Sequence, residues 1–159
     1  MKTLIVYYSL EGNTAETAGK IAAELHADLL CLEPVKAYPT GKVGKFVWGG
    51  KSAVMAEKPA LKPYSFQKSD YQRIIFGFPV WASTFAPPLR TFIREQDLSG
   101  LQFAAFACQT AAGAEKAFPK LKQELQIDRF AAELVLLDPK TKPDPKNDEK
   151  IKAFCQKLA

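Results

Sequence analysis

Four residues near the N-terminus have types and spacing suited to holding a phosphate group. They are Ser9, Gly12, Asn13 and Thr14, within the stretch YYSLEGNTAETA at residues 7–18. A glycine permits a close approach that a Cβ would block, and the free amides at the start of a following helix point toward an anion. The three polar side chains add donors. Helix capping by Asn13 or Thr14 would explain the same residues without a ligand.

Two further stretches follow apolar runs, and one of them carries aromatic residues. FPVWASTFAPP at residues 78–88 places Trp81 and Phe85 just after an apolar run, and CQTAAG at residues 108–113 follows another apolar run. A lone tryptophan is more often part of a core, but opposite a phosphate loop these aromatic side chains can flank a flat ring system. The three stretches together favour one binding site.

The elements that must position these stretches alternate along the chain. Apolar runs predict strands over residues 3–8, 27–33, 72–78, 101–108 and 131–137. Helix-like patterns predict helices over residues 14–27, 88–95, 114–125 and 146–158. Strands with interleaved helices predict a parallel sheet covered on both faces, because right-handed crossovers place the helices there. Ligands of such sheets bind beyond the carboxyl ends of the strands, where all three stretches lie.

Composition restricts the class of protein. The 159 residues are 47% apolar and 25% charged, which predicts a single domain over residues 1–159. No apolar run approaches the roughly 18 residues of a membrane span, and the opening run is too short for a signal peptide. Cys31, Cys108 and Cys155 lack metal-ligand spacing. We expect a reduced, cytoplasmic protein without membrane insertion or a metal site, whose cysteines are small buried residues.

The positive charge is concentrated in one segment. The chain has a net charge of +5, and residues 36–68 hold seven lysines against the single acidic residue Glu57. The lysines are Lys36, Lys42, Lys45, Lys51, Lys58, Lys62 and Lys68. Without arginine or a nucleic-acid motif, this segment predicts a solvated loop or an attractor of small anions rather than a nucleic-acid partner. The GGKS stretch at residues 49–52 lacks the glycine that a nucleotide-binding P-loop needs at position 45.

SLEGNT, PVWASTFAPPLRTFI and CQTAAGAEKAF, with the intervening KFVWGGKSAV, together resemble the short flavodoxin-like proteins. The resemblance covers nearly the whole chain. It implies an α/β three-layer sandwich of the flavodoxin-like type, with a five-stranded parallel sheet of order 2-1-3-4-5 and helices on both faces. It also implies noncovalently bound FMN, held by the three loops.

The resemblance assigns a set of residues to each part of FMN. For the phosphate these are Ser9, Glu11, Gly12, Asn13, Thr14 and Ala15. For the isoalloxazine ring they are Pro79, Val80, Trp81, Ala82, Ser83, Thr84 and Phe85, with Cys108, Gln109, Thr110 and Gly113 at the other edge of the ring.

The sequence departs from flavodoxins at two places in these loops. Many flavodoxins carry Ser or Thr where this chain has Glu11, whose carboxylate would repel a phosphate unless it points away. Many also have a glycine in the second loop, whose peptide can flip toward reduced flavin. No glycine occurs between Phe78 and Glu95, so a flip must use Ala82 or Ser83 and would be strained.

Three functions are compatible with these residues. The first is an FMN electron carrier that acts between redox partner proteins. The second is an NAD(P)H-dependent FMN reductase that acts on quinones or similar small acceptors, and the third is a non-redox module that binds a phosphate ligand or a protein. In the first two the cofactor supplies the redox chemistry, so we expect no catalytic side chain. A response-regulator receiver would need acidic residues where this chain has Tyr8–Ser9 and Phe78–Pro79.

Overall fold

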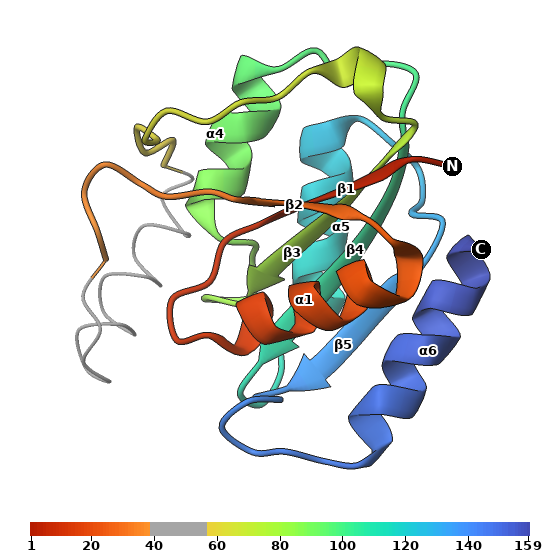
Figure 1. The fold of residues 1–159 in the computed structure, drawn as a ribbon. Coiled ribbons are helices and arrows are strands. Elements are labelled where there is room, and N and C mark those ends of the chain that lie inside the picture. The colour runs from red at the N-terminus through yellow and green to blue at the C-terminus, as the bar shows by residue number, and fades with distance from the viewer. Residues whose placement is uncertain (39–56) are drawn as a thin grey trace.

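The computed structural model describes residues 1–38 and 57–159 and contains a five-stranded parallel sheet. The strand order is β2-β1-β3-β4-β5, which confirms the predicted fold class and order (Figure 1). The strands are β1 (Thr3–Tyr7), β2 (Asp28–Cys31), β3 (Arg73–Pro79), β4 (Gln102–Gln109) and β5 (Glu133–Leu137). Each predicted strand is present, although β2 is shorter than the predicted 27–33.

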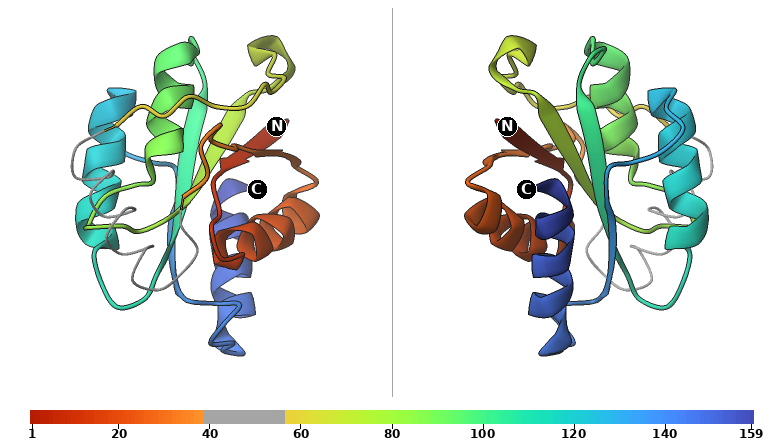
Figure 2. Two further views of the ribbon diagram at one scale, coloured as in Figure 1. Left: turned by 90° about the vertical axis from the view of Figure 1, so that its left-hand side faces the viewer. Right: turned by 90° about the vertical axis from the view of Figure 1, so that its right-hand side faces the viewer.

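In the described part of the chain, four α-helices cover the two faces of this sheet in pairs. They are α1 (Asn13–Leu25), α4 (Pro87–Glu95), α5 (Ala114–Leu125) and α6 (Lys146–Leu158). Figure 2 shows α1 and α6 on one face, and α4 and α5 on the other. None of the helices that the structure describes is both long and apolar enough to cross a bilayer.

The central strands are buried on both faces, as their continuous apolar sequences predict. Along β3, Ile74, Phe76 and Phe78 belong to the core under α4 and α5, and Ile75 belongs to the core under α1 and α6. This alternation follows from the two-residue period of a strand. The resulting rigid sheet fixes the positions from which the loops at its carboxyl edge depart.

Gly77 is required by packing across β3 and β4. It lies opposite Phe106 in the register of these two strands, and a Cβ at Gly77 would lie 2.1 Å from Cζ of that ring. The ring of Phe106 therefore fills the volume that any other side chain at position 77 would occupy. This close contact lies two residues before the end of β3, next to the loops of interest.

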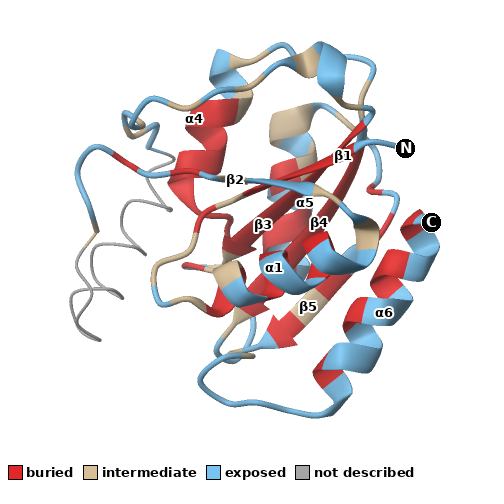
Figure 3. Cartoon of the chain, viewed as in Figure 1, coloured by how far each residue is buried: buried red, intermediate tan, exposed pale blue. Residues whose placement is uncertain are grey.

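The exposure of β2 corrects one prediction about the cysteines. Cys31 is exposed, whereas Cys108 and Cys155 are buried as predicted; all three lie within the described residues and are free thiols. β2 is an edge strand, and Figure 3 shows it largely exposed beside the buried β1 and β3. An edge strand has a sheet neighbour on one side only, so its side chains are less covered than those of the central strands.

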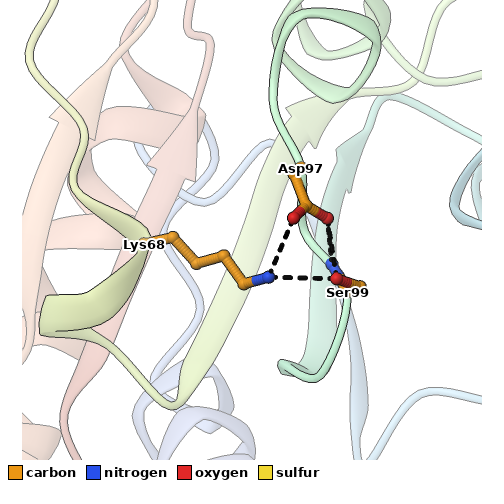
Figure 4. Close-up of polar contacts among 3 residues, drawn as sticks. All are labelled: Lys68, Asp97 and Ser99. Carbon is orange, nitrogen blue, oxygen red and sulfur yellow. Dashed lines mark hydrogen bonds and ion pairs between the residues drawn. The ribbon is translucent and has the colours of Figure 1, made fainter.

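The described part of the lysine-rich segment contains lysines that are already paired. Nζ of Lys62 lies 3.3 Å from Oε2 of Glu33. Nζ of Lys68 lies 3.2 Å from Oδ2 of Asp97 and donates to Oγ of Ser99 at 3.0 Å (Figure 4). The group around Lys68 precedes β3 and β4, at the edge of the sheet opposite the three loops.

The rest of the lysine-rich segment lies outside the part of the chain that the structure describes. Lys42, Lys45 and Lys51, together with the GGKS stretch at residues 49–52, lie outside the described residues. The expectation that their charge attracts small anions therefore stays a prediction.

Candidate functional site

The three predicted loops meet at a small cleft beyond the carboxyl ends of β1, β3 and β4. Predicted site residues that line it are Ser9, Glu11, Asn13, Thr14, Pro79, Val80, Trp81, Cys108 and Thr110. Leu10 and Asp138 line it as well and were not predicted. Their meeting at this edge is a direct result of the parallel sheet, because all its strands end on the same side.

The first loop is held in shape by Ser9. Its Oγ accepts hydrogen bonds from the amides of Gly12, at 3.2 Å, and Ala15, at 3.1 Å. The amide of Ala15 is therefore already paired, while the hydroxyl proton of Ser9 can still donate. Gly12 has a φ of 98°, the left-handed conformation that favours glycine, and α1 begins directly after it. The amides of Asn13 and Thr14 are thus the first of the helix.

Capping of α1 does not account for Asn13 or Thr14. The residue at the cap position is Gly12, and Oδ1 of Asn13 accepts instead from the amide of Lys140 at 2.8 Å. Oγ1 of Thr14 is buried and makes no hydrogen bond to nitrogen or oxygen among the described residues; its hydroxyl lies near the weakly hydrogen-bonding thiol of Cys108 and lowers the pKa of that thiol. An unpaired buried hydroxyl costs roughly 1–3 kcal/mol, so such groups call for an explanation. A phosphate oxygen in the cleft would accept its proton.

The second loop forms a tight turn from Trp81 to Thr84. The amide of each of these two residues donates to the carbonyl of the other, at 3.1 Å and 3.0 Å. Between them, Ala82 and Ser83 have φ values of 49° and 59°. Positive φ at both central residues is the pattern of a type I′ turn, which normally uses Asn and Gly. Both central residues thus adopt a left-handed conformation although neither is glycine. The strain of a peptide flip at these residues stays a prediction.

Trp81 belongs both to the cleft and to the core. Its side chain lines the cleft, is only 6% exposed, and makes edge-on contacts with Tyr8 and Tyr38 at centroid distances of 5.7 Å and 5.2 Å. The two interpretations of this tryptophan, ligand platform and core residue, are thus compatible. Tyr38 was not predicted, and its place in the sequence after β2 offers no motif that would have identified it.

Phe85 lies in the core and not in the cleft. It is fully buried, at a centroid distance of 6.4 Å from Phe78, and the guanidinium of Arg90 lies 4.6 Å from its ring centroid. The predicted contact between Phe85 and a flavin ring has no support in this geometry. The turn at residues 81–84 reverses the chain, so its two flanking aromatic residues do not share one wall of the cleft.

The third loop packs directly on the second. Gly113 has a φ of 117°, and a Cβ there would lie 2.9 Å from Cγ1 of Val80 and 3.2 Å from Cα of Ser83. Oε1 of Gln109 accepts from the amide of Ala114 at 2.9 Å, which assigns this side chain to the start of α5. The two loops therefore form one unit, and a substitution in either would move the other.

Cys108 lies at the floor of the cleft as a protonated thiol. Burial raises the pKa of Cys108 to about 11, and its Sγ lies 3.8 Å from Oγ1 of Thr17. At neutral pH it carries no negative charge, so it does not act as a nucleophile. This thiol therefore performs no chemistry of its own in the cleft.

A fourth loop, between β5 and α6, completes the cleft and was missed. Oδ1 of Asp138 accepts from Oγ1 of Thr110 at 3.4 Å, and the amide of Lys140 holds Asn13 as described. The stretch DPKTKP at residues 138–143 is polar and follows the carboxyl end of a strand, as the three predicted loops do. That position was the signal that could have identified it.

A larger groove between α4 and α5 is less suited to a flat ligand. It is lined by Arg90, Arg94, Glu124 and neighbouring polar residues. Glu124 accepts a hydrogen bond from Arg94, and its Oε2 lies 3.6 Å from Nε of Arg90. These charges pair with one another. Of the loops that form the cleft, the second also reaches this groove, because the predicted site residues Ala82 and Thr84 line the groove and not the cleft.

Comparison with known proteins identifies the family. The sequence model of the flavodoxin family matches residues 2–151. No curated protein sequence matches the chain at a significant level.

Solved structures share the fold at low sequence identity. A candidate flavoprotein from Bacteroides uniformis is 23% identical, with a TM-score of 0.80 over 98% of this chain and 97% of that one. A flavoprotein from Lactobacillus acidophilus, crystallised with FMN, is 18% identical, with a TM-score of 0.73 over 94% and 97%. Flavodoxin 1 from Bacillus cereus is 20% identical, with a TM-score of 0.62 over 99% and 97%. From the family match over nearly its whole length, the chain belongs to the flavodoxin family.

Proposed function

We propose that this chain transfers electrons through FMN bound noncovalently at the cleft. Membership of the flavodoxin family and the FMN complex of the Lactobacillus acidophilus relative support the choice of cofactor. The observation that carries the assignment is Thr14, a buried hydroxyl at the first turn of α1 that makes no hydrogen bond to nitrogen or oxygen among the described residues, in a cleft that also contains Trp81. Bound FMN supplies the one- and two-electron redox chemistry that amino-acid side chains lack.

The first loop binds the phosphate. The free amides of Asn13 and Thr14 lie at the positive end of the α1 dipole, which favours an anion. The hydroxyl of Thr14 would donate to a phosphate oxygen, and Gly12 leads the chain into α1 through its left-handed conformation. Glu11 is exposed, so its carboxylate can point to solvent while its backbone stays in the loop.

The second and third loops bind the ring. Trp81, Val80 and Pro79 provide an apolar wall that excludes water from one side of it. The turn at residues 81–84 would hold one edge of the ring. Gly113 supports that turn from below, as its contacts with Val80 and Ser83 indicate.

Titration of the apo-protein with FMN and with riboflavin tests the binding site. Two or more charge-assisted hydrogen bonds to the phosphate should make FMN bind roughly tenfold tighter or more. Equal affinities for the two flavins would contradict the phosphate site.

Anaerobic mixing with NADPH tests electron transfer. An electron carrier loaded with FMN should be reduced slowly by NADPH alone and rapidly once a protein reductase is added. Rapid reduction by NADPH without a partner would instead support the NAD(P)H-dependent reductase, and failure to change redox state with any donor would contradict both.

A further inference from the structure

The loop between β5 and α6 is fastened to the start of α1. Oδ1 of Asn13 accepts from the amides of Lys140, at 2.8 Å, and Thr141, at 3.4 Å. The amide of Lys142 donates to the carbonyl of Asp138 at 2.7 Å, which closes the loop on itself. The backbone of Lys140 is therefore held in a defined position beside the first turn of the helix.

The side chain of Lys140 lies along Gly12. A Cβ built at Gly12 would be 2.7 Å from Nζ of Lys140, 3.1 Å from its Cδ and 3.4 Å from its Cε. The ammonium group thus lies within contact distance of the residue that precedes α1. A Cβ at position 12 would displace the flexible end of this lysine, and glycine leaves it in place.

Acidic residues lie around this loop, and the ammonium group of Lys140 can offset their negative charge. Glu16 is exposed on the first turn of α1, and Asp138 lines the cleft. A phosphate dianion bound at this helix start would lie among carboxylates, which repel it. Helix amides and the Thr14 hydroxyl contribute partial charges only, whereas Lys140 carries a full positive charge.

We infer that Lys140 supplies the positive charge of the phosphate site, from a loop that the family resemblance does not assign to FMN. This inference rests on the proposed function and adds one feature to it. The site selects a phosphorylated flavin by an ion pair as well as by helix amides. The ammonium acts across Gly12, so its contribution is electrostatic and falls as salt rises.

A purely mechanical role for Lys140 makes a different prediction. If its stem only supported the loop, its removal would loosen the whole cleft and weaken FMN and riboflavin alike. An electrostatic role affects FMN alone, because riboflavin has no phosphate. The two flavins therefore separate the two roles.

The test compares Lys140→Gln with Lys142→Gln. Lys142 is an exposed lysine of the same loop, so both variants lose the same charge. We expect Lys140→Gln to bind FMN roughly three- to tenfold more weakly at low salt and riboflavin as the parent does. Lys142→Gln should keep the parent's affinity for both flavins. Between roughly 20 and 300 mM salt, the FMN affinity of Lys140→Gln should fall less than that of the parent.

Other outcomes would overturn the inference. Equal losses for the two flavins would assign Lys140 a structural role, and equal losses in the two variants would indicate a general effect of net charge. If the parent bound neither flavin, the proposed function would fail, and inorganic phosphate would become the probe. Thermal stabilisation by phosphate over chloride at equal ionic strength, present in the parent and reduced in Lys140→Gln, would still support the inference; its absence would overturn it.

Discussion

Two neighbouring polar residues of the first loop, Asn13 and Thr14, differ in their hydrogen bonding in the folded chain. The Asn13 amide group is paired with the β5–α6 loop, whereas the buried Thr14 hydroxyl makes no hydrogen bond to nitrogen or oxygen among the described residues. The first contributes to the stability of the apo-protein, and the second is available to a ligand. Their sequence context is the same, so the difference arises from what each side chain reaches.

Thr14→Val should therefore separate binding from stability. Valine keeps the shape and removes an unpaired hydroxyl, so the apo-protein should be as stable as the parent or more stable. FMN binding should weaken by about 1–2 kcal/mol, measured by titration, because a hydrogen bond to a charged group is lost. Thr17→Val, one turn further along α1 and outside the cleft lining, is the control and should keep FMN affinity. A similar loss of riboflavin affinity in Thr14→Val would argue against a phosphate contact.

Trp81→Ala should affect both stability and binding, because Trp81 is core and cleft residue at once. We expect FMN affinity to fall by about 1–3 kcal/mol from lost apolar contact, and the melting temperature of the apo-protein to fall as well. Phe92→Leu, a core change remote from the cleft lining, controls for general destabilisation. If Phe92→Leu weakened FMN binding as much as Trp81→Ala at equal loss of stability, the ring contact would be refuted.

At the scale of the element, the turn after β3 is the strained part of the site. Ala82 and Ser83 both adopt left-handed conformations that cost a residue with a Cβ about 1 kcal/mol each. Two hydrogen bonds between Trp81 and Thr84 hold the turn, and Gly113 packs beneath it. Nζ of Lys120 also donates to the carbonyl of Ser83 at 3.2 Å. The α5 helix thus supports a backbone conformation that the local sequence does not favour.

Ala82→Gly and Ser83→Gly should each stabilise the apo-protein by about 0.5–1 kcal/mol, measured by chemical denaturation. Glycine adopts positive φ without steric cost, and this gain exceeds its greater entropy in the unfolded chain. Ala86→Gly is the matched control, because Ala86 has a φ of −65° and should lose stability on the same change. Destabilisation by all three substitutions would mean that the turn at residues 81–84 is not strained.

For the molecule as a whole, the two edges of the sheet have separate roles. The carboxyl edge carries the four loops of the cleft. The amino edge carries a polar group in which the hydroxyl and amide of Ser99 and the ammonium of Lys68 lower the pKa of Asp97 to about 2 (Figure 4). Changes at the amino edge should therefore alter the acid response of the fold without altering flavin binding.

Asp97→Asn tests this separation. A carboxylate whose pKa is lower in the folded state, about 2 against 3.8 ordinarily, stabilises the fold above pH 4, and this contribution is lost as the pH falls toward 2. The melting temperature of the parent should thus fall over that window more steeply than that of Asp97→Asn. FMN affinity at neutral pH should be the same in both proteins. Identical acid profiles would show that the group around Lys68 is too solvated to matter.

Much of the fold followed from local patterns. Buried runs such as Thr3–Tyr7 and the amphipathic pattern of α1 depend on neighbours one to four residues apart, which the sequence displays directly. The strand order came from the resemblance of the loop motifs, and the resemblance also located three of the four loops. The common carboxyl edge then required no further information, because parallel strands end on one side.

What the sequence by itself determined was therefore the fold, the three loops and their meeting at one edge. Tertiary structure alone decided which of these side chains are paired or buried within the protein and which can contact a ligand. Asn13 is paired with a residue 127 positions away, Phe85 is turned into the core, and Cys31 is exposed because β2 has a neighbour on one side only. Each outcome depends on contacts between segments that are distant in the chain. The local sequence therefore does not show that the β5–α6 loop pairs with Asn13 rather than with Thr14.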